Sequence, residues 1–500
     1  MREIITTQDI RLAHPNNCAC ATDGYYTRFA NNLYDRLRGF VGKDFPDKNF
    51  TRTLACKLTC YFEDIVADMG VWRMFSNECM KLYGYPVPMY HAEEEYYPDE
   101  PSLNAVRYLV WDVACELFPD RLFETDRLLL EMGQEAYRIL DAAFESAPIN
   151  EEAKTEMNNM LHYASEGFNE LRDVLGWMLA GCYITSGRWL NEDMRDKAKE
   201  IKDIPVFKQM ATSMRQYFIL SEMKFNNRIG PLALLPYEWL QRLAVATGND
   251  DLARLLEEVE VQEMDTYKYD PDADEDPLTL ENTHGKVIKV SHKELNLTSE
   301  IIKANNGCAA SFVFFKGEWR LNGVLLPLKL DDGAFEEIKQ RQRDIPKENE
   351  RFMSSEEILQ KTNGKRIVYF KDADEMLRYL QDIFKYPASI SDNKELNSLE
   401  APCMFVDIEN KTDNQFFAPL VERSIKDPDN PYYDAEKAKT DAVDILWNCN
   451  MVSTHFAHYL IKEGFLPDAE TSWVFSQKST HEQRVADMDF FMRTNRRRDY

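Results

Sequence analysis

The sequence predicts an α+β multi-domain protein, in which an all-α helical domain precedes an α+β domain with a small, mainly antiparallel or mixed sheet. Three observations support this fold class. From residue 51 to residue 260, apolar residues recur every three or four positions, which is the period of an amphipathic helix. An acidic segment with Pro271 and Pro277 interrupts that period. After it, short runs rich in Val, Ile and Phe alternate with helical patterns.

The chain of 500 residues is too long for one ordinary core, because domains commonly contain about 150 residues. Only 19 residues are Gly and 20 are Met, a composition that suits packed helices better than many tight turns. We therefore expect a loop-rich and helical lead-in over 1–50, an all-α domain over 51–260, an acidic linker over 261–283 and an α+β domain over 284–500.

The helices of the all-α domain are predicted from their apolar stripes. Leu54 and Leu58 start one stripe, and the pattern continues toward Met80. Gly248 suits the end of one helix and Asn249 the start of the next, which predicts a helical hairpin. The remaining helices are expected over 104–118, 125–145, 151–183, 205–225, 236–246 and 249–260.

The strands of the α+β domain are predicted from β-branched and aromatic runs. Lys316-Gly317 or Asn322-Gly323 supplies the turn of a hairpin whose first strand includes Phe312. Strands are expected over 286–292, 308–319, 365–370 and 402–409. Helices are expected over 353–361, 372–384, 434–463 and 480–494.

The charge constrains the partners of the protein. The chain has 60 Lys and Arg against 86 Asp and Glu, a net charge of −26, so nucleic acid and anionic membranes are not expected as partners. The acidity is concentrated in 91–120 and 251–281. If charge recruits a partner, we expect a protein with a basic surface that meets residues near 93–100 or 257–276.

The sequence also predicts a compartment. Its most apolar central run, 176–184, is far shorter than the roughly 20 residues that a membrane helix needs. No apolar stretch follows Arg2, so no secretory signal is expected. The ten cysteines are then best explained as reduced thiols of a cytoplasmic protein.

Glycine-rich phosphate loops, dinucleotide fingerprints and nucleophile elbows are absent from the sequence. The resulting hypothesis is an interaction or adaptor protein that docks partners through its helical domain, without a cofactor. The absence of these motifs does not exclude a catalytic site whose residues lie far apart in the sequence.

The alternative hypothesis is a metal-dependent hydrolase, nuclease-like, in the C-terminal half. Asp407 and Glu409 follow an apolar strand and point to one face, where two carboxylates suit a divalent metal. The further ligands or base would be His455, His458, His481 and Asp487. This order resembles the acidic–histidine 3′–5′ exonucleases, although the last spacing is one residue longer and no hairpin follows the first strand.

A second group of metal-ligand residue types lies near the N-terminus. His14, Cys18 and Cys20 form an H-x3-C-x-C pattern, and Cys56 and Cys60 lie on one helical face, so together they offer enough ligands for zinc. However, Cys56 and Cys60 fall within an apolar stripe, where Cys behaves as a small buried hydrophobe, and C-x-C is tighter than typical zinc motifs. The structural interpretation is therefore favoured here.

Overall fold

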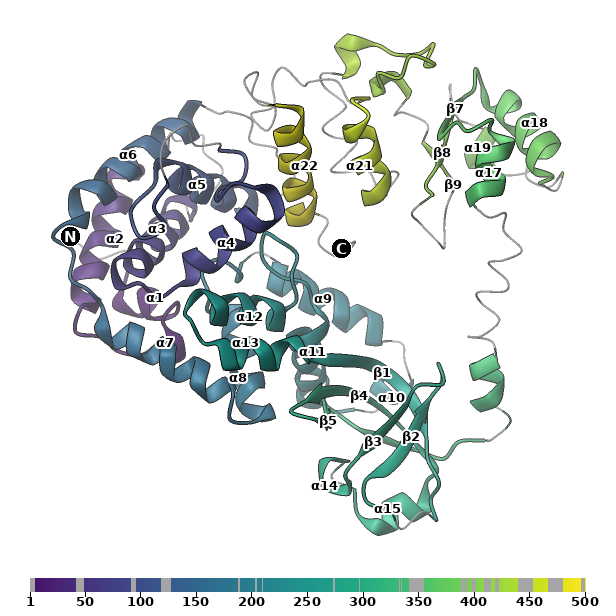
Figure 1. The fold of residues 1–500 in the computed structure, drawn as a ribbon, viewed down its shortest axis with the longest axis horizontal. Coiled ribbons are helices and arrows are strands. Elements are labelled where there is room, and N and C mark those ends of the chain that lie inside the picture. The colour runs from purple at the N-terminus through teal and green to yellow at the C-terminus, as the bar shows by residue number, and fades with distance from the viewer. Residues whose placement is uncertain are drawn as a thin grey trace. The chain divides into compact units, whose positions relative to one another are not determined.

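A computed structural model of the chain shows two compact units, residues 1–342 and 343–500, which are described separately (Figure 1). The structure describes residues 5–41, 49–90, 96–117, 127–187, 189–202, 205–208, 210–272, 275–295, 297–331, 333, 335–340, 355–386, 388, 391, 394–397, 402–408, 415–418, 422–438, 453–465, 480–495 and 500.

The first unit begins with a helical array. Its elements are α1 (Thr7–Arg11), η1 (Pro15–Asn17), α2 (Asp23–Leu37), α3 (Phe50–Ala67), α4 (Val71–Tyr83), α5 (Leu103–Leu117), α6 (Arg127–Phe144), α7 (Glu151–Ala164), α8 (Phe168–Ala180), α9 (Trp189–Lys202), α10 (Pro205–Lys208), α11 (Thr212–Asn226), α12 (Pro236–Ala246) and α13 (Asp250–Glu257). The predicted hairpin of α12 and α13 is confirmed, because Gly248 adopts a positive φ of 76° and the Asn249 side chain caps α13. Helix α9 was not predicted, since its sequence is strongly charged.

Helix α3 is the most enclosed helix of the array and contributes Leu54, Leu58 and Phe62 to the core. It also carries buried charged side chains, each of which contacts a different neighbour. Lys57 pairs with Asp112 of α5. Glu63 contacts His14 in the N-terminal loop and Asn150 at the start of α7. Asp64 contacts the start of α4 and Tyr183.

Two predicted helices are each divided in two by a corner. The pattern from 51 toward Met80 breaks between α3 and α4 at Gly70, whose φ is +90° and whose place leaves no room for a Cβ beside Thr247. The expected helix 151–183 breaks between α7 and α8, where Gly167 is the N-cap of α8. The apolar period continues across both corners, so periodicity alone does not reveal them.

The same unit continues into an antiparallel sheet of β1 (Glu260–Lys268), β2 (Leu278–Asn282), β3 (Val287–Val290), β4 (Gly307–Phe315), β5 (Glu318–Leu321) and β6 (Leu326–Leu328), in the order β3-β2-β1-β4-β5 with β6 on β4. Lys316 and Gly317 both have positive φ and form the predicted β4–β5 turn. The short helices α14 (His292–Leu295) and α15 (Ser299–Ala304) follow β3.

The structure differs from the expected acidic linker at 261–283. Most of that segment lies in strands β1 and β2, and Leu278 and Leu280 are buried against Ile288 and Val290 of β3. The boundary between compact units instead falls between Gln342 and Arg343. Asp265 of the segment lies 3.0 Å from His284, and Glu260, directly before the segment, lies 2.6 Å from Lys286.

Polar contacts, buried at Asn322 and exposed at Lys316, join the sheet to the helices. The Asn322 amide, which follows β5, donates to the Ser221 carbonyl oxygen and to Glu222 Oε1 of α11, each at 3.2 Å. At the opposite end of this hairpin, Lys316 Nζ donates to the Glu166 carbonyl oxygen between α7 and α8 at 3.1 Å. The first unit therefore combines helices and sheet in one body.

The second unit contains α17 (Ser355–Lys361), β7 (Ile367–Tyr369), α18 (Ala373–Phe384), α19 (Lys394–Asn397), β8 (Cys403–Val406), β9 (Gln415–Ala418), η3 (Glu422–Ser424), α21 (Thr454–Lys462) and α22 (His481–Asn495). Its sheet is antiparallel, in the order β7-β8-β9. Apolar side chains of α17 and α18 pack on β8. The N-terminal part of the expected helix 434–463 falls mostly outside the described residues.

Together the units confirm the predicted fold class, a helical N-terminal region with small antiparallel sheets after it. None of the helices that the structure describes is long and apolar enough to cross a membrane.

The buried Asp64 carboxylate makes the stability of the helical array depend on pH. It accepts hydrogen bonds from Trp72 N at 2.6 Å and Val71 N at 3.2 Å at the start of α4, and from Tyr183 Oη at 2.8 Å. Burial raises the pKa of Asp64 from 3.8 to about 6, although these hydrogen bonds oppose the rise. The folded protein therefore holds a proton that the unfolded chain releases between pH 4 and 6.

We predict that the unfolding free energy of the wild type, minus that of Asp64→Asn, falls by up to about 3 kcal/mol as the pH rises from roughly 4 to 6. Urea unfolding of both full chains at several pH values measures this difference. Asp251→Asn is the control, because that side chain is 92% exposed. A difference that stays constant or grows with pH contradicts the prediction.

Candidate functional site

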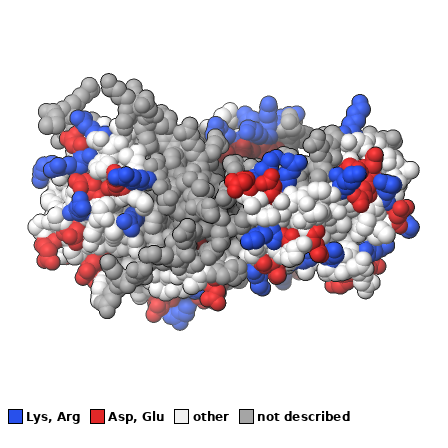
Figure 2. All heavy atoms as spheres, turned by 90° about the horizontal axis from the view of Figure 1, so that it is seen from above, with Lys and Arg blue, Asp and Glu red and all other residues white. Residues whose placement is uncertain are grey.

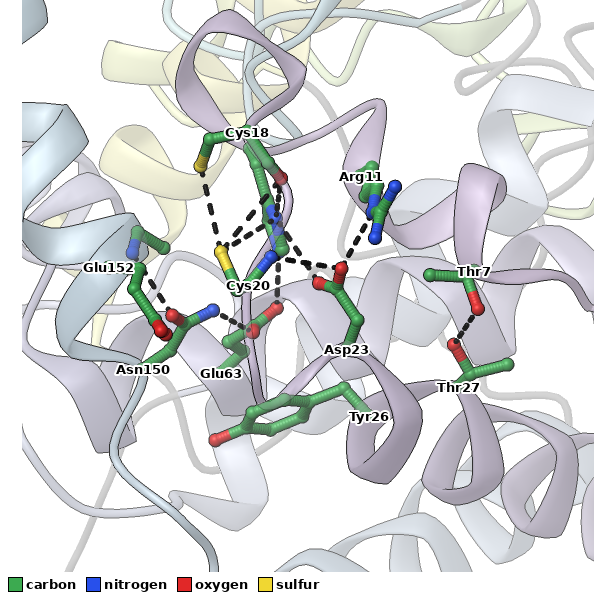
Figure 3. A network of polar contacts seen from close by, with 12 residues as sticks. Thr7, Arg11, Cys18, Cys20, Asp23, Tyr26, Thr27, Glu63, Asn150 and Glu152 are labelled. Atoms are coloured by element: carbon green, nitrogen blue, oxygen red, sulfur yellow. Dashed lines mark hydrogen bonds and ion pairs between the residues drawn. The ribbon is translucent and has the colours of Figure 1, made fainter.

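The loop between α1 and α2 brings distant polar groups together. Asn16 and Asn17 adopt positive φ values of 52° and 51°, a left-handed conformation that Asn tolerates better than most residues. This turn reverses the chain directly after His14 and returns Cys18 and Cys20 toward the imidazole (Figure 3). The three side chains form what we call the His–Cys cluster.

The ligand atoms of the His–Cys cluster, His14 Nδ1, Cys18 Sγ and Cys20 Sγ, all lie within 4.8 Å of one another. The two sulfur atoms are 3.6 Å apart, and Cys20 Sγ is 3.7 Å from His14 Nδ1. His14 and Cys20 are buried, whereas Cys18 is partly exposed. Imidazole nitrogen and thiolate sulfur are ligands that transition metals favour.

The orientation of the His14 ring is set by its outer nitrogen. Nε2 donates to Glu63 Oε2 of α3 at 2.9 Å, and both side chains are at most 2% exposed. Glu63 Oε1 in turn accepts from Asn150 Nδ2 at 2.6 Å, and Asn150 Oδ1 caps α7 by accepting from Ala153 N. The second nitrogen, Nδ1, lies 3.2 Å from the Cys18 carbonyl oxygen and 3.7 Å from Cys20 Sγ.

Asp23, the first residue of α2, lies at the edge of the cluster (Figure 3). Its Oδ2 accepts from Arg11 Nε at 2.6 Å and from Cys20 N at 3.0 Å. Its Oδ1 is buried, lies 3.9 Å from His14 Nδ1 and accepts no hydrogen bond from the described residues. A buried carboxylate oxygen without a hydrogen bond destabilises the fold unless a cation lies close to it.

Without a metal, the ligands of the cluster hold protons at neutral pH. Burial raises the pKa of Cys18 to about 12 and also raises that of Cys20, so both are thiols at neutral pH. Burial would lower the pKa of His14, but the hydrogen bond and charge of Glu63 raise it overall. A metal at this cluster would therefore displace protons from its ligands.

Only part of this site was foreseen from the sequence. Cys56 and Cys60 do not belong to the group of ligand atoms found among the described residues, and Cys60 is buried in the core. Asp23 lies only three positions after Cys20, so the sequence near the His-Cys pattern already offered it as a further ligand. Glu63 is 49 residues from His14, and only the packing of α3 brings it there.

An open pocket of about 580 Å³, which we call the acidic pocket, adjoins the same loop. Its lining is polar and comes from η1, α7, the α7–α8 turn and α8: Asn16, Glu156, Asn159, His162, Tyr163, Glu166 and Asp173. The Glu156 carboxylate accepts from the Asn16 amide at 2.7 Å and from the Asn159 amide at 3.2 Å, which are both neutral donors. Glu166 lies 3.9 Å from the His162 ring.

The acidity of the chain is not spread over broad areas in the view that Figure 2 gives. There, acidic and basic side chains are interspersed over the coloured part of the surface. Of the two acidic segments singled out from the sequence, residues 93–95 lie outside the described part, and Glu260 and Asp265 pair within the sheet.

In the C-terminal unit, Asp407 directly follows strand β8 and is buried. Its Oδ2 accepts a hydrogen bond from Ser453 Oγ, the N-cap of α21, and its Oδ1 lies 4.0 Å from Arg366 Nη2. Arg366 also stacks over the Tyr459 ring, 3.9 Å from its centroid. These contacts give Asp407 a role in attaching α21 to the sheet.

The other described residues of the predicted hydrolase site make contacts of their own. His455 is exposed on α21, whereas His458 Nε2 lies 3.0 Å from Asp489 Oδ1 of α22 and 3.1 Å from Tyr500 Oη. Asp487 is buried on α22. Glu409 and the side chain of His481 lie outside the described residues, so a shared hydrolase site stays a prediction.

Comparison with known proteins identifies the family to which the chain belongs. No curated protein and no solved structure matches the chain. The sequence does match the family described as "Protein of unknown function (DUF3843)" over residues 5–281 and 328–495, which include the His–Cys cluster and the acidic pocket. Because these stretches cover most of the 500 residues, the chain belongs to the DUF3843 family.

Proposed function

We propose that the protein is an interaction protein whose helical array binds a basic segment of a protein partner in the acidic pocket. The observation that carries this proposal is the composition of the pocket. It combines the carboxylates of Glu156, Glu166 and Asp173 with the ring of Tyr163, and its lining includes no Lys or Arg.

Cations of the protein compensate the three carboxylates only in part. Within the described part of the chain, no Lys or Arg nitrogen forms an ion pair with Glu156, Glu166 or Asp173. Amide donors satisfy the hydrogen-bonding capacity of Glu156 without neutralising its charge. An arriving guanidinium or ammonium group therefore meets carboxylates that no described Lys or Arg ion pair occupies, although Lys224 attracts Asp173 and Lys316 lies at the Glu166 carbonyl oxygen.

Tyr163 adds an aromatic surface to this charge. It is 40% exposed at the pocket, so its ring is accessible to a cation. A guanidinium held between carboxylates and a tyrosine ring gains charge-assisted hydrogen bonds and a cation–π contact. The net charge of −26 would also attract a basic segment from a distance and speed its association.

The carboxylates can be tested by neutralising two of them. We expect Glu156→Gln combined with Asp173→Asn to weaken the binding of a fluorescein-labelled arginine-rich peptide by about tenfold or more, because hydrogen bonds to charged groups contribute roughly 1.5–3 kcal/mol each. Fluorescence polarisation with the full chain at physiological salt measures the affinity.

A charge-matched control separates the pocket from general attraction. Asp250→Asn combined with Asp251→Asn removes the same charge from the exposed start of α13. We expect this variant to bind the peptide with nearly wild-type affinity. Equal weakening by the two double variants would show that the peptide responds to net charge alone, and the proposal would be wrong.

A further inference from the structure

We propose that the first unit contains a structural zinc site, in which His14 Nδ1, Cys18 Sγ and Cys20 Sγ are ligands that already lie together. Asp23 Oδ1, 3.9 Å from His14 Nδ1, would move in as the fourth ligand when the ion binds. The inference rests on the geometry of the His–Cys cluster and is independent of the proposed docking function. Zinc is the metal chosen because it favours a small tetrahedral set of thiolate, imidazole and carboxylate ligands.

Two of the separations among the ligand atoms match a tetrahedron around zinc. With zinc–sulfur bonds of about 2.3 Å and zinc–nitrogen bonds of about 2.0–2.1 Å, the edges of a tetrahedron measure roughly 3.5–3.8 Å. The two sulfur atoms are 3.6 Å apart, and Cys20 Sγ is 3.7 Å from His14 Nδ1. The two edges that include Cys20 Sγ therefore fit a zinc ion, whereas the Asp23 carboxylate, outside the group of atoms within 4.8 Å of one another, would have to move closer to it.

Asp23 supplies the independent evidence for a bound cation. Its side chain is only 5% exposed, and no described residue donates a hydrogen bond to Oδ1, which lies 3.9 Å from His14 Nδ1. Arg11 and Cys20 N hold the other oxygen, so the carboxylate cannot turn Oδ1 toward solvent without losing both contacts. A zinc ion would satisfy this oxygen and complete four-coordination.

The outer contacts of His14 are also those of a metal ligand. Metal-bound histidines usually donate their second nitrogen to a carboxylate or carbonyl, which fixes the ring and strengthens the metal bond. Glu63 accepts from His14 Nε2 in this manner, and Asn150 holds Glu63 from the opposite side. Glu63 is therefore a positioning residue, not a ligand.

Four protein ligands leave no open position for substrate, which is typical of a structural site. The ion would join η1 and its loop to α2 and, through Glu63 and Asn150, to α3 and α7. Asn16 lies within this loop and lines the acidic pocket, so the zinc site would also hold one wall of that pocket in place.

The site is tested with the full chain expressed in zinc-supplemented medium and dialysed. Inductively coupled plasma mass spectrometry should find one zinc per chain in the wild type and none above background in Cys18→Ser combined with Cys20→Ser. Cobalt added after chelator treatment should give the wild type the visible bands of a tetrahedral ion and a sulfur-to-cobalt charge-transfer band.

The control variant is Cys56→Ser combined with Cys60→Ser, which removes two thiols from α3 outside the cluster. We expect it to retain one zinc and the charge-transfer band. Loss of zinc from the control alone, retention of zinc in the Cys18 and Cys20 variant, or a wild type with neither zinc nor the cobalt bands overturns the proposal. The wild-type measurements decide the question even if a variant fails to fold.

Glu63→Gln tests the outer contact with a readout that general destabilisation does not mimic. We expect it to weaken zinc affinity by roughly 10–100-fold in competition with a chromogenic chelator, while the sulfur-to-cobalt band keeps its position. Glu151→Gln, exposed in the first turn of α7, should leave the affinity unchanged. Unchanged affinity in Glu63→Gln would contradict the assigned role of Glu63.

Discussion

The arrangement of the first unit depends on the buried charges of α3. A charged side chain in the interior is costly unless it is paired and hydrogen-bonded, so each charge on this helix requires a partner at a defined place. Lys57 positions α5 through Asp112, and Asp64 positions the start of α4 and Tyr183. Glu63 requires His14 on one side and Asn150 on the other. Apolar burial stabilises the array, whereas these charges select which neighbours lie where.

This constraint connects the core to the candidate sites. Glu63 is buried with the core residues of α3, yet its carboxylate determines which nitrogen of His14 faces the cysteines. The same loop that carries His14 and the cysteines supplies Asn16 to the acidic pocket. Both sites are thus connected to the core of the first unit through the loop that carries His14.

Local features of the fold could be predicted from the sequence, and long-range pairing could not. The α12–α13 hairpin and the Lys316-Gly317 turn follow from the preferences of a few adjacent residues. The acidic segment 261–283 suggested a linker because composition does not reveal that its apolar residues pack in a sheet and that His284 lies opposite Asp265. At the His–Cys cluster, His14, Cys18 and Cys20 were visible as a pattern, but Glu63 and Asn150 come from helices whose packing no single sequence reveals.

Asn150 has a consequence for the mutational tolerance of the protein. One atom of its amide accepts from Ala153 N to begin α7, and the other donates to Glu63. Aspartate would keep the first contact but place a second carboxylate against Glu63, and serine would begin the helix but is too short to replace an amide donor at the same distance. Any evolutionary drift at this position must therefore disturb either the start of α7 or the orientation of Glu63. A single uncharged side chain is thus among the least replaceable in the first unit.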